Sequence, residues 1–313
     1  MTAPRVVCLV GPTASGKTSL AIELAEVLGG EVVSADSRQV YRRMDVGTAK
    51  PTREERRRVP HHCLDLIEPT DSFDAARFRD AAARAVEDVS AHGRVPLVVG
   101  GTGLWVRVLL RGLCPAPPRA PAVRAALRAL AARRGANELH RHLAAIDPTA
   151  AARLHPRDTV RVERALEVAF ASGRRLSDWQ AAHGFADAPY DALVVGLALE
   201  TPDLDARIEA RARRMVAAGF AEEVRRLRAS GLADTAPAWA SVGYREMRAY
   251  VDGTRDLDSA LVALVRGTRR FARRQRTWFR GEPGILWRHP EKDRERVLAE
   301  AAAFLARGER PAA

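Results

Sequence analysis

Short, valine-rich apolar runs alternate with helical patterns in the first third of the chain. Three such runs occupy Val6 to Val10, Glu31 to Ala35 and Val95 to Val99, and glycine or polar residues bound each of them. Runs of this length beside helical patterns predict buried parallel strands in an α/β fold. A fourth run, from Ala192 to Glu200, predicts that the sheet resumes further along the chain.

The stretch between the third and fourth runs has a different pattern. After the proline-rich CPAPPRAP, the segments AVRAALRALAARRG, NELHRHLAAI and TVRVERALEVAFASG have helical spacing and almost no strand pattern. We therefore expect an α/β core made of residues 1–121 and 192–313, with C-terminal helices. A helical domain of residues 122–191 is expected to be inserted into this core.

The charge balance favours a polyanionic partner. The chain has 51 basic and 39 acidic residues and a formal net charge of +12, which promotes binding to polyanions through long-range attraction and counterion release. Codon composition explains why nearly all basic residues are arginine, but it does not explain why they cluster. No stretch approaches the roughly 18 apolar residues of a membrane span. We therefore expect a cytoplasmic protein with no membrane partner.

The octapeptide GPTASGKT follows the first apolar run and matches the phosphate-binding pattern G-x-x-x-x-G-K-[ST]. Its glycines let backbone amides converge on phosphate oxygens, the start of the next helix adds positive potential, and Lys17 supplies a charge. The Thr18 hydroxyl is suited to hold Mg²⁺. A P-loop NTPase-like core is therefore expected. Its phosphate site would comprise Gly11, Pro12, Thr13, Ala14, Ser15, Gly16, Lys17 and Thr18.

Two further residues are expected at the same edge of the sheet. An ATP-hydrolysing P-loop protein usually has a strand that ends in a magnesium-binding aspartate, but the run Val95 to Val99 ends in glycines and Thr102. Asp36 instead follows the second run. Because parallel strands open their carboxyl ends on one edge, Asp36, Thr102 and the P-loop should share a cleft. Asp36 as a metal ligand or helix cap, and Thr102 as a helix cap, remain alternatives.

Two other motifs have competing interpretations. PHHC, at Pro60 to Cys63, is expected to have a loop role, because no second spaced pair completes a metal site. The run Arg266 to Arg280 contains seven arginines and no acidic residue, with Phe271, Trp278 and Phe279 interleaved. A charged run is usually a solvent-exposed helix face. The single sign of this run favours contact with a phosphate backbone.

Seven blocks of the sequence together resemble one known family. They are GPTASGKT, VVSADSRQVYRRMDVGTAKP, PHHCLDL, VVGGTGLW, HPRDTVRVERALEV, SVGYRE and RRFARRQRTWFRG. In this order they are similar to the bacterial tRNA dimethylallyltransferases, also called tRNA isopentenyltransferases, of the IPP transferase family. Trp105 stands where tyrosine is common in that family. The resemblance implies a P-loop core related to small-molecule kinases and a helical insertion that binds the anticodon stem-loop of tRNA.

The resemblance also implies a reaction. The family moves a dimethylallyl group from dimethylallyl diphosphate to N6 of adenosine 37, beside the anticodon, with Mg²⁺ and release of diphosphate. Asp36 matches the general base, Thr102 matches the residue that orients the target nucleotide, and Lys17 would stabilise charge on the diphosphate. Arg207 or Arg211 matches an arginine that reaches the diphosphate. Thr18 is the expected Mg²⁺ ligand.

The expected tRNA contacts come from several segments. A stacked adenine cannot be alkylated, so the target base must be flipped into the cleft. The positions that match the family's contacts to this base and to the rest of the tRNA are Asp36, Ser37, Arg38, Gln39, Thr102, Arg124, Val160, Arg161, Val162, Glu163, Arg164, Ala240, Ser241, Val242, Gly243, Tyr244 and Arg245. The run after Arg266 is expected to support the same surface, and the protein is expected to be a monomer.

Three other functions compete with this one. An adenylate isopentenyltransferase acting on free AMP or ATP would share Asp36, Thr102 and the P-loop, but it has less use for the insertion and the arginine run. A small-molecule kinase would use ATP at the P-loop. A non-catalytic RNA-binding protein with a relic P-loop is disfavoured, because Lys17, Thr18 and Asp36 are all intact.

Overall fold

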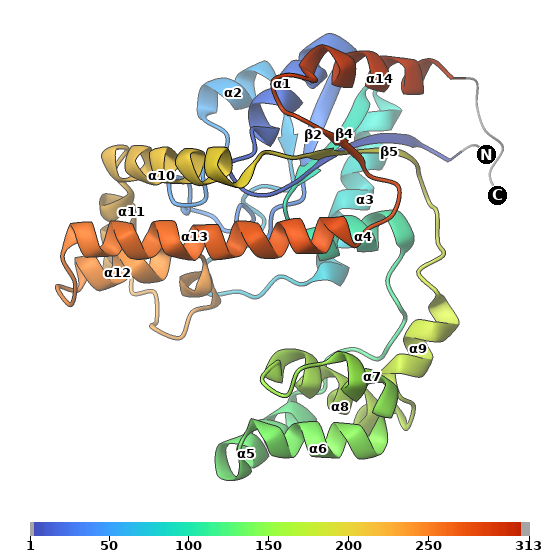
Figure 1. The fold of residues 1–313 in the computed structure, drawn as a ribbon, viewed down its shortest axis with the longest axis vertical. Helices are drawn as coiled ribbons and strands as arrows, with labels where there is room; N and C mark the ends of the chain where they lie inside the picture. Colours follow the sequence, from blue (N-terminus) through green and yellow to red (C-terminus); the bar gives the residue numbers. More distant parts are fainter. Residues whose placement is uncertain (1–2, 308–313) are drawn as a thin grey trace. The chain divides into compact units, whose positions relative to one another are not determined.

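The computed structural model describes residues 3–307, which form two compact units (Figure 1). The first unit combines the chain up to Leu110 with the chain from Ala188 onward. The second unit comprises Arg111–Asp187, whereas the sequence predicts a helical insertion of residues 122–191. Each unit has its own hydrophobic core.

A parallel sheet of six strands forms the centre of the first unit, in the order β3-β2-β4-β1-β5-β6. The strands are β1 (Arg5–Val10), β2 (Gly30–Ser34), β3 (His61–His62), β4 (Val95–Gly100), β5 (Asp191–Leu197) and β6 (Leu286–Arg288). The four longer strands confirm the predicted α/β fold, and all of them pair in parallel. The hydrophobic pattern does not predict β3 and β6, because two or three residues are too few to show a period.

Helices pack on both faces of this sheet (Figure 1). They are α1 (Lys17–Leu28), α2 (Arg53–Arg58), α3 (Ala75–Ala91), α4 (Gly103–Arg111), α10 (Thr201–Ala217), α11 (Phe220–Ala229), the 3-10 helix η1 (Pro237–Ala240), α12 (Tyr244–Val251), α13 (Leu257–Arg280) and α14 (Arg294–Ala306). Val7 and Leu9 of β1 belong to one core with residues of α1 and α14. Val6 and Cys8 belong to the other core, with residues of α3, α4 and α10–α13. Both faces of β1 are therefore buried, as expected for a central parallel strand.

Across residues 3–307, no helix combines the length and the apolar character that a membrane span requires.

The second unit is helical throughout its described elements. They are α5 (Pro121–Arg134), α6 (Ala136–Ile146), α7 (Pro148–Arg153), α8 (Thr159–Ser172) and α9 (Leu176–His183). Leu139, Leu143, Val162 and Leu166 are almost completely buried at the centre of this unit. These residues recur on one side of α6 and of α8, which explains the helical spacing seen in the sequence.

A buried carboxylate ties the proline-rich stretch to the second unit. Glu167, whose side chain is not exposed, accepts hydrogen bonds from the Ala120 amide at 2.7 Å and from the guanidinium groups of Arg124 and Arg164 at 2.7 and 2.9 Å. Arg164 also donates to the Pro117 carbonyl at 2.6 Å. Burial raises the pKa of Glu167, but these hydrogen bonds outweigh burial and lower the pKa to about 2. The stretch before α5 therefore belongs to this unit.

We predict that Glu167→Gln destabilises the protein by about 3 kcal/mol near neutral pH, because two arginines lose their buried partner. The pKa of Glu167 is depressed in the folded state, so its contribution is complete above its ordinary pKa of 4.5 and is lost as the pH falls toward about 2. Urea denaturation of both proteins should show a large stability difference near pH 7 and a smaller one near pH 3. An equal difference at both pH values would contradict this role of Glu167.

Candidate active site

The P-loop lies where the sequence predicts it, between the end of β1 and the start of α1. Gly11, Ala14 and Gly16 have positive φ angles of 144°, 65° and 90°. A Cβ on Gly11 would lie 2.8 Å from the Leu197 carbonyl oxygen, so this position requires glycine. The Ser15 hydroxyl is buried and has no hydrogen-bond partner among the described residues. The turn leads directly into α1, whose first amides are free to bind an anion.

Cationic side chains converge on this loop. The cavity beside it is lined by Thr18, Lys17, Arg207, Arg211 and Arg214. Lys17 Nζ donates a hydrogen bond to the Pro12 carbonyl at 2.6 Å. Burial lowers the pKa of Lys17 to about 7; the Asp36 carboxylate opposes this shift, and the Arg211 guanidinium adds to it. A ligand with several negative charges would stabilise the charged form of Lys17.

The two candidate arginines for the diphosphate lie in different surroundings. Burial lowers the pKa of the Arg211 guanidinium, while the Asp36 carboxylate opposes this shift. Arg211 also lines a second cavity, which contains Asp36. Arg207 donates a hydrogen bond to Glu291 at 2.5 Å, and its Nη1 lies 3.7 Å from the position of a Cβ built on Gly16. Both arginines therefore face the P-loop, and Arg211 in addition connects it with Asp36.

Thr102 holds the turn that carries Asp36. The Thr102 amide donates to the Ala35 carbonyl at 3.2 Å, and Thr102 Oγ1 accepts a hydrogen bond from the Ser37 amide at 3.0 Å. The Asp36 Oδ1 atom accepts a hydrogen bond from the Arg38 amide at 2.8 Å. A turn, and no helix, follows Asp36, so this residue is not a helix cap. Asp36 and Thr102 are thus neighbours at the carboxyl edge of the sheet.

Asp36 also shares a small cavity with the P-loop. Lys17, Thr18, Gln39 and His61 line this cavity together with Asp36. The Thr18 hydroxyl is a hard oxygen donor of the kind that Mg²⁺ prefers, and the Asp36 carboxylate can bind the ion directly or through water. Phosphate oxygens and water would supply its other ligands. The residues present therefore fit a magnesium ion next to a bound phosphate group.

The second cavity beside Asp36 has an apolar wall. Helices α10 and α13 supply this wall with Ile208, Ala212, Met215, Leu264 and Phe271. Arg38, Arg211 and Arg274 add positive charge to the same cavity. Asp36 therefore lies between a cationic phosphate site and a surface suited to a hydrocarbon group.

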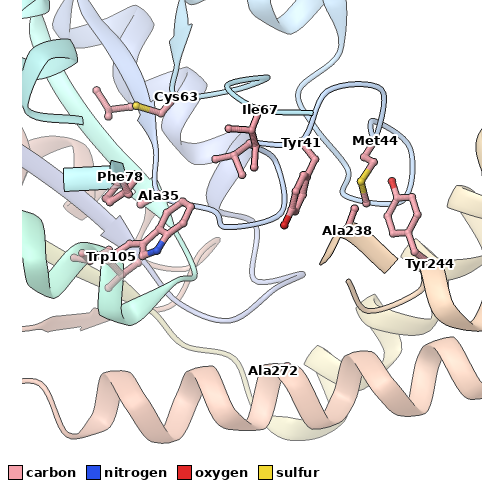
Figure 2. Close-up of a cluster of buried hydrophobic side chains, with 14 of the residues drawn as sticks. Ala35, Tyr41, Met44, Cys63, Ile67, Phe78, Trp105, Ala238, Tyr244 and Ala272 are labelled. Carbon is pink, nitrogen blue, oxygen red and sulfur yellow. The ribbon is translucent and has the colours of Figure 1, made fainter. Parts of the chain in front are cut away.

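The loop after β2 is anchored by a buried glutamate that the sequence analysis does not identify. Glu223 of α11 accepts hydrogen bonds from the amides of Asp45, Val46 and Gly47 at 2.7, 2.7 and 3.0 Å. It also accepts one from the Tyr244 hydroxyl at 2.6 Å. Figure 2 shows the ring of Tyr244 beside the side chain of Met44, a residue of the loop after β2. These contacts fix Gly47, which lines the second cavity.

A buried lysine anchors the same loop. Lys50 Nζ donates to the Tyr41 carbonyl at 2.5 Å and to the carboxylates of Asp45 and Asp65 at 2.7 and 2.6 Å. Its side chain is only 1% exposed. Lysine occurs only three times in this arginine-rich chain, and that rarity is the one signal in the sequence that could have identified Lys50.

The expected tRNA-contact positions of the first unit divide into two groups. Ala240, Ser241 and Val242 line the second cavity with Asp36, and Arg38 does the same. The others are engaged inside the protein or lie apart from the cavity. The Gln39 side chain accepts a hydrogen bond from Ser34 Oγ and donates one to the Ala49 carbonyl. Gly243 has a φ of 96° at the start of α12, and Tyr244 is completely buried. Arg245 is exposed and pairs with Glu246.

The expected contacts in the second unit divide in the same way. Val160 is 75% exposed, and Arg161 is also exposed, with its guanidinium paired to Asp158. Val162 is completely buried in the core of the unit. The remaining three, Arg124, Glu163 and Arg164, belong to the ion-pair network around Glu167. Val160 and Arg161 are therefore the positions of this set most accessible to a partner.

The two histidines of the PHHC motif lie in a strand and not in a loop, which corrects the sequence interpretation. His61 and His62 form the edge strand β3, which pairs with Val32 and Val33 of β2. His62 Nε2 lies 2.7 Å from a carboxylate oxygen of Glu31. Residues 3–307 contain no cluster of three or more histidine, cysteine, aspartate or glutamate side chains that could hold a metal.

The arginine run forms the second half of α13, and acidic residues of α10 partly neutralise it. Arg269 pairs with Asp205 and Glu209 at 3.3 and 3.6 Å. The surface around the run therefore carries both positive and negative charges, although the run itself contains only positive ones. Arg273 is exposed and has no carboxylate partner among the described residues. The unpaired arginines remain suited to contact a phosphate backbone.

Comparisons with known proteins relate the chain to one group of enzymes. The sequence model of a family described as IPP transferase matches residues 39–282. The tRNA dimethylallyltransferase of Geobacter metallireducens is 51% identical over 283 residues, which cover 90% of this chain and 92% of that protein.

Two solved structures are also similar. The tRNA isopentenylpyrophosphate transferase of Bacillus halodurans has a TM-score of 0.71 and 37% identity, with 96% of each chain covered. A eukaryotic dimethylallyltransferase acting on tRNA has a TM-score of 0.83 over 98% of this chain and 81% of that chain. Its identity is 23%, so this likeness concerns the fold alone.

Proposed function

The chain belongs to the IPP transferase family, and we propose that it transfers a dimethylallyl group from dimethylallyl diphosphate to N6 of adenosine 37 in tRNA. One observation carries this proposal. Asp36 shares one cavity with Lys17 and Thr18, and another with the apolar wall of α10 and α13. A carboxylate between these two surfaces is suited to a substrate whose diphosphate leaves and whose hydrocarbon group moves.

The P-loop would bind the diphosphate of the donor. Amides at the start of α1, Lys17 and Arg211 are already directed at this site, so they would stabilise the charge that accumulates on the leaving group. We propose that Thr18 would hold Mg²⁺ beside the diphosphate and that the Asp36 carboxylate would remain free to accept a proton. When bound, Mg²⁺ would neutralise part of the diphosphate charge.

Asp36 would act as the general base. The N6 amine of adenine is a weak nucleophile, because its lone pair is delocalised into the ring. In the proposed step, this lone pair forms a bond to C1 of the dimethylallyl group, and the C1–O bond breaks with its electrons passing to the diphosphate. The N6 proton passes to the Asp36 carboxylate, which Thr102 holds in place through the neighbouring residues.

The family relationship favours tRNA over a free adenine nucleotide as the acceptor. The relative with 51% identity is named a tRNA dimethylallyltransferase, and the likeness extends over most of both chains. A net charge of +12 suits a large polyanion better than a single nucleotide. We propose that the flipped adenosine enters beside Ala240 to Val242, which line the cavity of Asp36.

We also propose that the enzyme is active as a monomer and acts in the cytoplasm.

We predict that Asp36→Asn lowers the rate of dimethylallyl transfer by at least about 100-fold, because the amide cannot accept the N6 proton. The affinity for tRNA should remain largely unchanged, since the substitution keeps the size of the side chain. Single-turnover assays and tRNA titrations of the variant test this, with the exposed Asp80→Asn as a control for the loss of one negative charge. Wild-type turnover in the Asp36→Asn variant would contradict the assignment of Asp36 as general base.

We also predict that Arg273→Ala weakens tRNA binding and reduces the slope of log affinity against log salt concentration by roughly 0.5–1. Arg269→Ala is the matched control on the same helix, because Arg269 is already paired with acidic residues of α10. Its effect on the slope should be smaller. Equal slopes for Arg273→Ala and the wild type would show that this side of α13 does not contact tRNA.

A further inference from the structure

Gln275 is a buried amide within the arginine-rich half of α13. The residue is only 7% exposed, although exposed arginines precede it in the sequence. Glutamine is seldom buried without hydrogen-bond partners, because an unsatisfied amide costs about 1–3 kcal/mol. The buried amide group of Gln275 is therefore expected to be hydrogen-bonded.

The oxygen and the nitrogen of this amide both form hydrogen bonds, each with a different loop. Gln275 Oε1 accepts a hydrogen bond from the Thr13 amide of the P-loop at 2.9 Å. Gln275 Nε2 donates one to the Gly101 carbonyl, also at 2.9 Å. One partner is a donor and the other an acceptor, so only one orientation of the amide satisfies both. A Cβ on Gly101 would lie 2.2 Å from Nε2, so this close contact depends on a glycine.

Gly101 connects Gln275 to the candidate base. It directly precedes Thr102, which forms the hydrogen bonds to Ala35 and Ser37 on either side of Asp36. A continuous series of short contacts therefore runs from the P-loop through Gln275 and Thr102 to the turn of Asp36.

We propose that Gln275 is a positioning residue that fixes the separation between the P-loop and the turn of Asp36. The P-loop holds the leaving diphosphate and Asp36 accepts the proton, so their separation determines whether both act on one bound substrate pair. The kinetic consequence of this inference rests on the proposed function. Its structural consequence, that loss of Gln275 loosens both loops together, does not.

Two substitutions separate the contacts. Gln275→Met keeps a long side chain and removes both hydrogen bonds. Gln275→Glu keeps an acceptor for the Thr13 amide and places an oxygen against the Gly101 carbonyl. Val297→Ala is the control for lost core packing, because Val297 is completely buried in α14 and belongs to neither loop.

Hydrogen exchange tests the structural consequence without any assay of activity. In Gln275→Met, the peptides that contain Thr13 and Thr102 should both exchange about 3–10-fold faster than in the wild type. In Val297→Ala, neither peptide should change. Exchange that is unchanged in both peptides, or faster in only one, would overturn the proposal.

Steady-state kinetics test the functional consequence. Both Gln275 variants should lose about 10–100-fold in kcat, with much smaller changes in KM for dimethylallyl diphosphate and for tRNA. Val297→Ala should keep its kcat well below its unfolding temperature. A kcat within about twofold of the wild type in Gln275→Met would overturn the positioning role. If the wild type transfers no dimethylallyl group, the proposed function fails, and the exchange experiment alone decides the role of Gln275.

Discussion

The two hydrogen bonds of Thr102 to the residues on either side of Asp36 are the contacts on which the whole site depends. They are possible because β2 and β4 are adjacent parallel strands, with Ser34 beside Val99. A Cβ on Gly100 would lie 2.1 Å from the Ala35 carbonyl oxygen, so glycine lets the two strand ends approach. On its other side β4 pairs with β1, which leads into the P-loop. Three adjacent strands thus bring the P-loop, Thr102 and Asp36 to one edge of the sheet.

This arrangement explains how a P-loop can serve a reaction that transfers no phosphoryl group. In the proposed reaction the loop and its arginines would bind a polyphosphate, and this ability would be the same whether the phosphate is transferred or leaves. The difference lies in what faces the phosphate site. Asp36 and an apolar wall from α10 and α13 are placed there, which suits transfer of a hydrocarbon group to an amine. The chemistry is therefore determined by the surroundings of the loop more than by the loop itself.

Much of this site could be predicted because its signals are local. The P-loop is a contiguous strand–turn–helix motif, and the nearness of Asp36 to Thr102 follows from the shared edge of parallel strands. Glu223 could not be found in this way, since it contacts Asp45 across 178 positions of sequence. Tyr244 shows the same limit, because only the tertiary contact with Glu223 shows that its side chain faces the core.

The histidine pair and the second unit illustrate a related limit. His61 and His62 form a strand only because β2 offers an edge for pairing, and two residues carry no period that would indicate this. Within α8, helical spacing predicts the helix but not which neighbouring residues are buried: Val160 is exposed, whereas Val162 is part of the core. Burial of individual side chains depends on packing partners that are distant in the sequence.

Product analysis tests the central claim most directly. The protein would be incubated with dimethylallyl diphosphate or ATP, each with tRNA or AMP, and the products would be identified by mass spectrometry. The account predicts one product above background: tRNA in which one adenosine has exchanged a hydrogen for a dimethylallyl group, with diphosphate released intact. A phosphorylated product, or dimethylallyl transfer to AMP in preference to tRNA, would contradict it.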